Sequence, residues 1–281
     1  MWLNSGCKNL SKCFGLEMVV EKFDMIITEN GNKKVSYKLI EIEILSTKYF
    51  EADSKLTESG LNRIGQALDF FRYSGTATGF LRDVEPILQN GPQCGLVALQ
   101  MAAGSFGIPF YEIDHIFQLA KDKNYSNHGE IFSVTWLADL VVSLWPKLET
   151  VICAMPDKER LIELLLLNHV ILVPYDCDGR MEPTLQQGRF AHWCIIIGYL
   201  KTSDVNDDDL YVFCMHGKSR RLFLYDYFFL VKSNCNLFQV SIKQHKSKTK
   251  GVGSRIAEYI IPFNGLESLR NKCLILKSSY I

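Results

Sequence analysis

The sequence predicts an α+β protein in which a helical half is followed by an antiparallel sheet. The 281 residues are 47% hydrophobic and 22% charged, the balance of a globular protein with one large core or two modest ones. Between residues 91 and 168, apolar residues recur at helical spacing. From residue 170 onward, β-branched and aromatic runs alternate with polar turns. Helices and strands that are segregated in this way are typical of the α+β class.

The first 80 residues carry the weakest pattern. Residues 35–45 alternate like a strand, although a helix is not excluded, and residues 56–80 indicate a helix followed by a loop. We therefore expect residues 1–60 to form an N-terminal segment that packs on a main domain of residues 61–281.

Four helices are predicted in the middle of the chain. The first follows the Gly91-Pro92 turn and ends near Gly104. The third has an amphipathic stripe and is stopped by Pro146. The other three helical segments are residues 111–122, 133–144 and 157–168.

Six strands are predicted after the last helix. Their residues are β-branched or aromatic and are bounded by polar turns. A basic segment, residues 243–255, is expected to be a loop. The predicted strands are residues 170–175, 192–200, 210–216, 221–230, 257–263 and 272–277.

Composition and charge disfavour several classes of protein. Lysine plus arginine and aspartate plus glutamate both number 31, and this zero formal charge argues against a nucleic-acid binder. No apolar run reaches the ~18 residues of a membrane span. The N-terminus lacks a charged start followed by an apolar stretch, so no secretory signal is expected. We therefore expect a cytoplasmic protein that binds neither nucleic acid nor membrane.

The nine cysteines predict neither a disulfide framework nor a metal centre. Their number is odd, and no CxxC pair occurs. In a reducing compartment most should be small buried hydrophobic residues. The cysteines and histidines do not form two closely spaced ligand pairs, so we expect no metal.

Cys94 differs from the other cysteines by its surroundings. In QNGPQCGLVALQMAA it lies where a Gly-Pro turn enters a helix, where free N–H groups should lower the thiol pKa. Gly95 should leave room for a substrate backbone, and Gln89 could help the Cys94 N–H to bind an oxyanion. We expect a thiol-directed reagent to label Cys94 first. The alternative is a cysteine that is merely buried at a helix start.

A cysteine nucleophile needs a histidine base, and His192 is the best of six candidates. It stands at the first position of a buried strand in GRFAHWCIIIGYL, where a rigid imidazole can point across a cleft. His115 and His128 fall in predicted helical or loop regions, His169 at a helix-to-strand junction and His245 in the basic loop, whereas His216 ends the strand predicted at 210–216.

These residues carry a resemblance to the actin maturation protease family, which is distantly related to bacterial leader-processing peptidases of the papain-like group. The similarity covers roughly residues 80–280. It lies in Q-x-G-P-x-C-G-L-x-A-L at residues 89–99, V-P-Y-D at 173–176, A-H-W at 191–193, H-G-K-S at 216–219 and S-N-x-x-L at 233–237.

The resemblance implies a papain-like fold over residues 61–281 as a catalytic domain. It also implies a cytosolic thiol protease, an aminopeptidase that removes an N-acetylated Met or Cys from immature actin. Cys94 would be the nucleophile, His192 the general base and Gln89 an oxyanion donor. The N-terminus of actin would be the protein substrate, and we expect a monomer with no cofactor.

Two features depart from this pattern. Papain-like enzymes carry Asn or Asp one strand after the histidine, where this chain has His216. His216 could orient His192 as a neutral acceptor, Asp226 or a backbone carbonyl could do so, or the enzyme could work as a dyad. Some family members also have a proline-rich extension, whereas this chain has eight scattered prolines.

An enzyme for acidic N-termini should place cations beside its cleft. The candidates are Lys218, Arg220 and Arg221 in HGKSRR and the basic loop at 243–255, although both could be solvated turns. We also expect Gly95 and Trp193 to contact substrate. Two other functions stay open: a different Cys/His hydrolase, such as an isopeptidase or amidase, and an inactive binding module.

Overall fold

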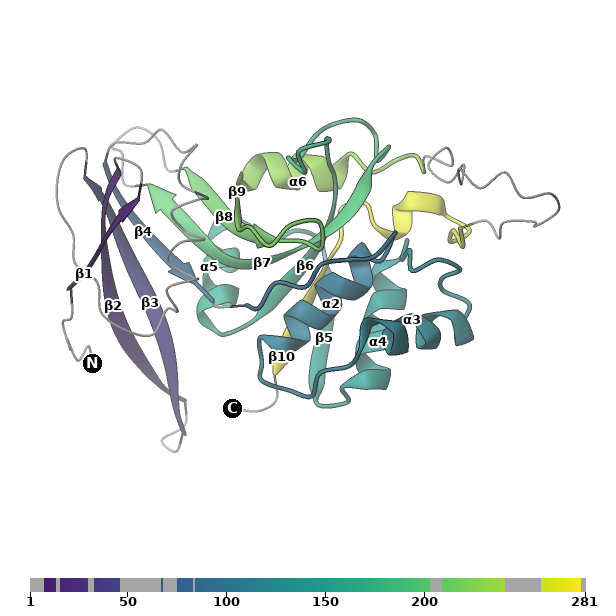
Figure 1. The fold of residues 1–281 in the computed structure, drawn as a ribbon, viewed down its shortest axis with the longest axis horizontal. Coiled ribbons are helices and arrows are strands. Elements are labelled where there is room, and N and C mark those ends of the chain that lie inside the picture. The colour runs from purple at the N-terminus through teal and green to yellow at the C-terminus, as the bar shows by residue number, and fades with distance from the viewer. Residues whose placement is uncertain are drawn as a thin grey trace.

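The computed structural model describes residues 8–13, 16–29, 33–45, 67, 75–82, 84–202, 209–240 and 259–278. Its centre is one ten-stranded sheet with the strand order β1-β2-β3-β4-β7-β6-β10-β5 (Figure 1). Off this path β8 pairs with β7 and β9 pairs with β8. Helices pack on both faces of the part that follows β4, so the α+β prediction is confirmed.

The N-terminal strands continue the same sheet. Residues 35–45 are strand, as predicted, but the loop expected up to residue 80 is wrong, because residues 75–81 form a strand. That strand joins the N-terminal part to β7 through antiparallel pairing. The bounds are β1 (Lys8–Cys13), β2 (Leu16–Glu29), β3 (Lys33–Leu45) and β4 (Gly75–Leu81). The predicted division at residue 60 stays a prediction.

The four predicted helices are confirmed. Two of them begin at side-chain caps: Ser133 accepts a hydrogen bond from the Trp136 N–H, and Asp157 accepts one from the Arg160 N–H. Their bounds are α2 (Cys94–Gly104), α3 (Ile113–Asp122), α4 (Val134–Leu144) and α5 (Lys158–Leu166).

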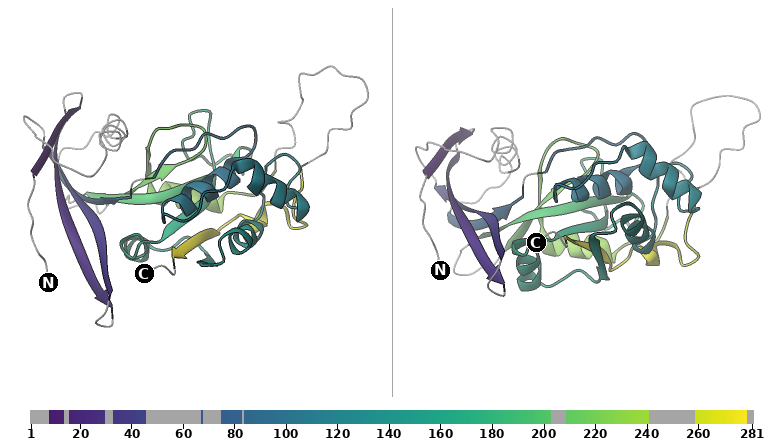
Figure 2. Two further views of the ribbon diagram at one scale, coloured as in Figure 1. Left: turned by 60° about the horizontal axis from the view of Figure 1, so that its bottom comes forward. Right: turned by 90° about the horizontal axis from the view of Figure 1, so that it is seen from below.

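The two central strands, β6 (Val170–Asp176) and β7 (Ala191–Thr202), are buried along almost their whole length and mostly apolar, because both sheet faces are covered. Val170 and Leu172 belong to the core that includes residues of α2, α3 and α4. Ile171 and Val173 belong to a second core, with residues of α5 and α6. Figure 2 shows the sheet edge-on between these helices.

The region after β8 (Leu210–Met215) differs from the prediction. Residues 221–230 were expected to form one strand, but β9 (Phe223–Asp226) ends at Asp226 and α6 (Tyr227–Cys235) begins there. The Asp226 carboxylate accepts a 2.7 Å hydrogen bond from the Phe229 N–H and so caps the helix. A short apolar run fits either structure, and here the cap decides for a helix.

Of the two strands predicted near the C-terminus, one is confirmed and one is wrong, and the confirmed strand pairs with a strand that was not predicted. β10 (Cys273–Ser278) matches the prediction, whereas residues 259–263 are irregular and lead to a short 3-10 helix, Gly265–Ser268. The Ile260 N–H donates to the Glu130 carboxylate at 3.0 Å, which satisfies the backbone without a strand partner. The edge strand β5 (Leu148–Cys153) was not predicted and pairs with β10.

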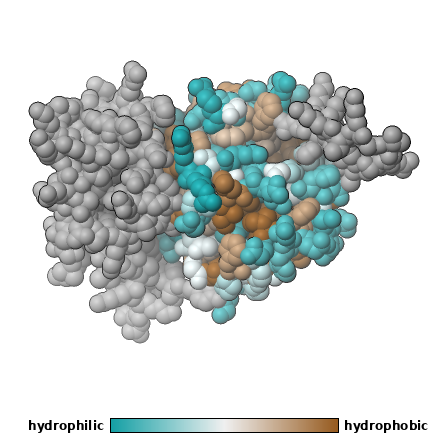
Figure 3. Space-filling view, in the orientation of Figure 1, coloured by the Kyte–Doolittle hydropathy of each residue, from teal (hydrophilic) through white to brown (hydrophobic). Residues whose placement is uncertain are grey.

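Helix α2 is buried on every side from Gly95 to Ala103. The sheet covers its inner face, and the segment of residues 84–92 runs along the outside (Figure 1). Val84 and Ile87 from this segment pack into the same core as the helix. Figure 3 shows hydrophobic residues gathered over this helix with hydrophilic ones around them. The papain-like prediction requires this arrangement of a buried helix, led by Cys94, against the strand that carries His192.

Candidate active site

Residues from six separate segments form one cleft at the start of α2. Its cavity volume is about 310 Å³, the size of a small-ligand site. Cys94, His192 and Gln89 all line it, so the fold brings together the three residues predicted to carry the chemistry. The remaining lining residues are Gly91, Pro92, Glu130, Ile131, Phe132, Arg189, Ala191, Trp193, Lys218, Tyr259 and Leu269.

Cys94 is the first residue of α2, and the turn before it is built as the sequence indicates. Gly91 has φ +67°, in the left-handed region where glycine is favoured. Gln93 is the N-cap residue of the helix. Its side chain accepts no hydrogen bond from the first N–H groups of the helix.

The thiol of Cys94 is nevertheless less acidic than predicted. Removal of water from the sulfur raises the pKa of Cys94, and this outweighs hydrogen bonds from the Trp193 and Gly95 N–H groups and the charge of Lys218. The expectation of a lowered thiol pKa is therefore wrong for the free protein. The resting nucleophile is a neutral thiol that depends on a base.

His192 can act as that base. Burial lowers the pKa of His192 well below its usual 6.5, and His216 and Lys218 lower it further, so the imidazole is neutral at pH 7. Its Nε2 is buried without a hydrogen-bond partner, so Nδ1 is the ring nitrogen that we assign to the base. Among the described residues no hydrogen bond joins His192 to Cys94, as is common before substrate binds.

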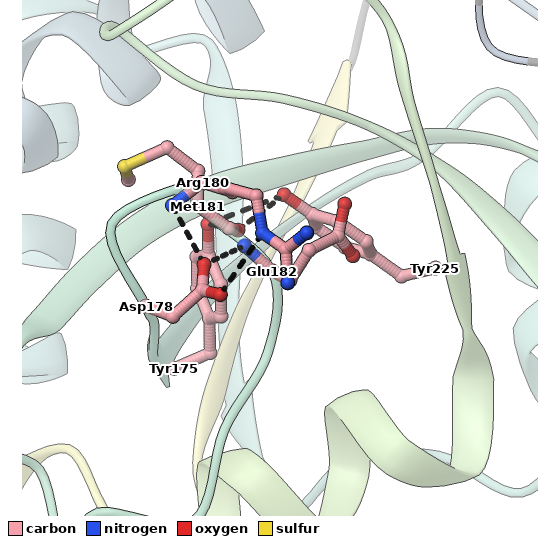
Figure 4. A network of polar contacts seen from close by, with 6 residues as sticks. All are labelled: Tyr175, Asp178, Arg180, Met181, Glu182 and Tyr225. Carbon is pink, nitrogen blue, oxygen red and sulfur yellow. Dashed lines mark hydrogen bonds and ion pairs between the residues drawn. The ribbon is translucent and has the colours of Figure 1, made fainter. Parts of the chain in front are cut away.

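A polar network supports the strand beside His192. Tyr175 is the β6 residue opposite His192, and the two rings meet edge to face at 6.1 Å. The hydroxyls of Tyr175 and Tyr225 both donate to the carbonyl oxygen of Met181, at 2.9 and 2.7 Å (Figure 4). Met181 has φ 71° in a tight turn. The Asp178 carboxylate fixes this turn by accepting hydrogen bonds from the N–H groups of Arg180 and Glu182.

Gln89 lies at the edge of the cleft and is held by its backbone. Its N–H donates to the carbonyl of Gly217 at 2.7 Å, and its side-chain Nε2 donates to the carbonyl of Gly91 at 2.5 Å. A Cβ on Gly217 would lie 2.9 Å from the Gln89 Cβ, so this approach requires glycine. Its role as an oxyanion donor stays a prediction.

His216 follows β8 and packs edge to face on His192, with 5.5 Å between ring centroids. Its Nδ1 accepts a 3.2 Å hydrogen bond from the Lys218 N–H. Burial lowers the pKa of His216 to about 4, so the ring is neutral and its proton sits on Nε2. An Nε2–H group is a donor, so this tautomer does not fit the predicted role of His216 as an acceptor for His192.

Asp226, the second candidate for orienting His192, is exposed and caps α6. It does not line the cleft. Of the alternatives raised by the sequence, the Cys–His dyad fits this geometry, because no carbonyl of the described residues accepts a hydrogen bond from His192 Nε2.

The cations of the HGKSRR segment separate in the structure. Lys218 lines the cleft, whereas Arg220 and Arg221 are exposed and are not part of its lining. Arg189, which the sequence did not single out, supplies a second cation. The basic loop at residues 243–255 lies outside the described residues, as does His245.

Gly95 and Trp193 have a packing role that the sequence did not reveal. A Cβ on Gly95 would lie 3.2 Å from the Trp193 indole and 3.3 Å from Ile131. The indole itself donates to the carbonyl of Ile131 at 2.9 Å. The space beside Gly95 therefore holds Trp193, which in turn lines the cleft, and is not open to a substrate backbone.

Sequence reasoning missed the wall of the cleft opposite β7. The buried Glu130 carboxylate accepts hydrogen bonds from the Ser126 hydroxyl and from the N–H groups of Asn127, His128 and Ile260. It thereby ties the C-terminal segment to the cleft. Burial, with smaller effects of Glu130 and Cys94, raises the pKa of Tyr259 to about 12. No local pattern marks these residues, because only the fold brings residues 130 and 260 together.

The described residues contain no group of three or more His, Cys, Asp or Glu side chains that could hold a metal ion. Within the same part of the chain, no helix is long and apolar enough to cross a membrane.

The buried histidines make stability depend on pH. The pKa of His216 is about 4 in the folded state and near 6.5 when unfolded, so the unfolded state binds more protons between these values. Stability is fully present above pH 6.5 and falls towards pH 4, by up to about 3 kcal/mol from this residue. We expect His216→Asn to flatten the fall in melting temperature between pH 7.5 and 4.5, and His115→Asn, on the exposed face of α3, to leave it unchanged. An identical fall in wild type and His216→Asn would contradict this assignment.

The cleft thus combines a thiol, a neutral imidazole, a carboxamide and two cations with an apolar wall. A thiol beside a neutral imidazole can attack a carbonyl carbon and form an acyl-enzyme. This is the chemistry of a hydrolase that acts on amide bonds.

Comparison with known proteins places this cleft in a family. Residues 84–200 match the profile "Actin maturation protease-like, C-terminal domain". An actin maturation protease of Drosophila melanogaster is 34% identical over 200 residues, which cover 69% of this chain and 68% of the fly protein. That of Mus musculus is 36% identical over 43% of this chain and 35% of the mouse protein. The crystal structure of a C39-like peptidase from Bacillus anthracis aligns with a TM-score of 0.40 and 11% identity over 70% of this chain and all of the other. The chain belongs to the actin maturation protease family.

Proposed function

We propose that this chain is a cytoplasmic cysteine aminopeptidase that removes the N-acetylated first residue, Met or Cys, from immature actin. The main support for the proposal is that Cys94, His192 and Gln89 line one cleft at a helix start. The names of the relatives supply the substrate: each is called an actin maturation protease. We expect the chain to act as a monomer.

The first step is acylation of Cys94. Nδ1 of neutral His192 takes the thiol proton, and the thiolate attacks the carbonyl carbon of the acetylated first residue. The N–H groups of Gly95 and Trp193, which hydrogen-bond to the sulfur, stabilise the thiolate before it attacks. The Cys94 N–H and the Gln89 carboxamide would stabilise the oxyanion, once the Gln89 Nε2 exchanges its hydrogen bond to the Gly91 carbonyl for one to the substrate oxygen.

The second step releases the products. The imidazolium of His192 protonates the amine of the shortened protein, which leaves as a free N-terminus. The neutral imidazole then activates a water molecule, which hydrolyses the thioester and releases the acetylated amino acid. Because burial disfavours a charged His192, the proton is held only briefly, and this favours its transfer to the leaving amine.

The lining of the cleft supports the substrate class. Ile131, Phe132 and Tyr259 form an apolar wall that fits the side chain of a first Met or Cys. Lys218 and Arg189 provide positive charge for acidic residues that follow.

The proposal is tested by incubating the folded chain with a peptide that begins acetyl-Met and continues with acidic residues. Mass spectrometry should detect loss of the acetylated first residue and nothing more. A matched peptide with a free α-amine should stay intact. Cleavage of an isopeptide or an unrelated amide, with the acetylated peptide unchanged, would instead favour the other hydrolase. Absence of turnover on every substrate would favour a binding module.

The cations of the cleft allow a sharp test of substrate selection. Lys218→Glu should raise KM for the acidic acetyl-Met peptide by about tenfold or more and change KM for a neutral peptide much less, because attraction becomes repulsion. Arg220→Glu is the control, since it makes the same change in charge two residues away and outside the lining. Equal effects of the two variants, or of one variant on both peptides, would contradict a substrate-reading role for Lys218. The kcat/KM of wild type should also fall with added salt.

A further inference from the structure

A pair of cysteines lies outside the proposed active site, between the edge strand β5 and its neighbour β10. Cys153 and Cys273 are direct register partners in this antiparallel pair, and their Sγ atoms are 3.7 Å apart. Residues opposite each other on antiparallel strands have Cα atoms about 4.5 or 5.5 Å apart. Both spacings lie within the range that a disulfide spans. The backbone therefore already holds the two residues where they can be bridged.

The two thiols have different surroundings. Cys153 is half-buried at the last position of β5, whereas Cys273 is fully buried. The hydrogen bond from Cys273, with help from Arg160 and against the effect of burial, lowers the pKa of Cys153 to about 7. The same contact and burial raise the pKa of Cys273 well above its usual value. One partner is thus a half-buried thiol that is partly ionised at neutral pH, and the other is a fully buried thiol that stays protonated.

Four other cysteines whose side chains the structure describes lack this combination. Burial raises the pKa of Cys94, Cys177, Cys214 and Cys235. Cys235 is exposed, and its sulfur contacts the side-chain oxygen of Asn271. Among the cysteines whose side chains are described, we therefore expect Cys153 to react with a thiol reagent before Cys94, contrary to the order that the sequence suggested.

We propose that Cys153 and Cys273 form a site of reversible oxidation, in which a low-molecular-weight disulfide such as glutathione disulfide converts the pair into a cross-strand disulfide. The Cys153 thiolate attacks one sulfur of the reagent, forms a mixed disulfide and expels one thiolate. The Cys273 sulfur then attacks the Cys153 sulfur, and the second thiolate leaves with the Cys273 proton. Two protein thiols and one disulfide thus become one protein disulfide and two small thiols.

The bond would fasten the edge of the sheet. β5 pairs only with β10 among the described strands, and the bridge would close a loop between residues 120 positions apart. Closing so long a loop restricts the unfolded chain and stabilises the folded one. Neither cysteine lines the cleft, so the oxidised protein should keep its active-site thiol.

The test treats the folded full chain with glutathione disulfide at pH 7, then alkylates, digests with trypsin and maps the peptides. We expect peptides 148–158 and 273–277 to appear joined by a disulfide, and the melting temperature to rise by several degrees. A small dithiol should reverse both changes. In the reduced protein, Cys153 should be alkylated at least about fivefold faster than Cys235, because its larger thiolate fraction outweighs its lower intrinsic nucleophilicity.

Variants separate the two steps. Cys273→Ala should retain one glutathione on Cys153, Cys153→Ser should form neither adduct nor bridge, and Cys235→Ser should behave as wild type. If Cys273→Ala does not fold, the proposal is tested by the wild-type peptide map alone, that is, by whether peptides 148–158 and 273–277 are joined by a disulfide. The proposal is overturned if another cysteine is modified first, or if wild type accumulates the Cys153 adduct without the bridge.

Discussion

Replacement of Cys94 by alanine is expected to reduce turnover of an acetyl-Met peptide by several orders of magnitude. The sulfur forms the acyl-enzyme bond, and no described neighbour can replace it, so the covalent route is lost. Cys94→Ser should fail similarly, because the resting site relies on a neutral His192, which is too weak a base to activate a hydroxyl here. Turnover is measured by the mass of the released peptide under single-turnover and steady-state conditions.

Stability serves as the control for this experiment. Cys94 lies at a helix start that is held by backbone hydrogen bonds, so Cys94→Ala should melt within a few degrees of wild type. Cys235→Ala, on the exposed end of α6, is the matched cysteine variant and should keep full activity. Near wild-type turnover in Cys94→Ala would remove the basis of the proposed mechanism.

Replacement of His192 by alanine is expected to abolish turnover as well, because the thiol of Cys94 has a raised pKa and is not ionised without a base. His115→Ala, on the exposed face of α3, should change activity less than about tenfold. A low rate in His192→Ala that recovers steeply at high pH would fit a mechanism in which solvent removes the Cys94 proton.

The pH profile of the wild type gives an independent check of His192. A base must be unprotonated, and the pKa of His192 lies well below 6.5, so the acid limb of kcat/KM should fall below pH 6.5. An acid limb above pH 7 would show that the base is charged in the free enzyme, and the neutral-pair mechanism would be wrong.

Much of the chemistry was visible in the sequence because it is encoded locally. The turn and apolar helix around Cys94 and the buried strand after His192 are short-range patterns of spacing and residue type, and the structure reproduces both. The four helices from α2 to α5 were also predicted, because their periodicity extends over two or more turns. The same local logic failed at Asp226, where an apolar run is compatible with a strand or a helix and a single cap selects the helix.

Electrostatics could not be predicted from neighbours in the chain. A helix start lowers the pKa of a cysteine, yet the pKa of Cys94 is raised, because burial by β7 and the surrounding loops outweighs the local N–H groups. His216 occupies the expected position one strand after His192, but the Lys218 N–H fixes its tautomer and makes it a donor. Desolvation and tautomer depend on every group packed around a site, and the sequence does not specify that packing.

The sequence by itself determined the α+β class, the identity of the candidate nucleophile and base, and the family. The tertiary structure decided which cations reach the cleft, what fills the space beside Gly95, and that Glu130 anchors the segment of Tyr259. It also paired Cys153 with Cys273 across two strands. The physical reason is range: helix periodicity, turns and caps act within a few residues, whereas burial, charge and thiol pairing act between residues that only the folded chain brings together.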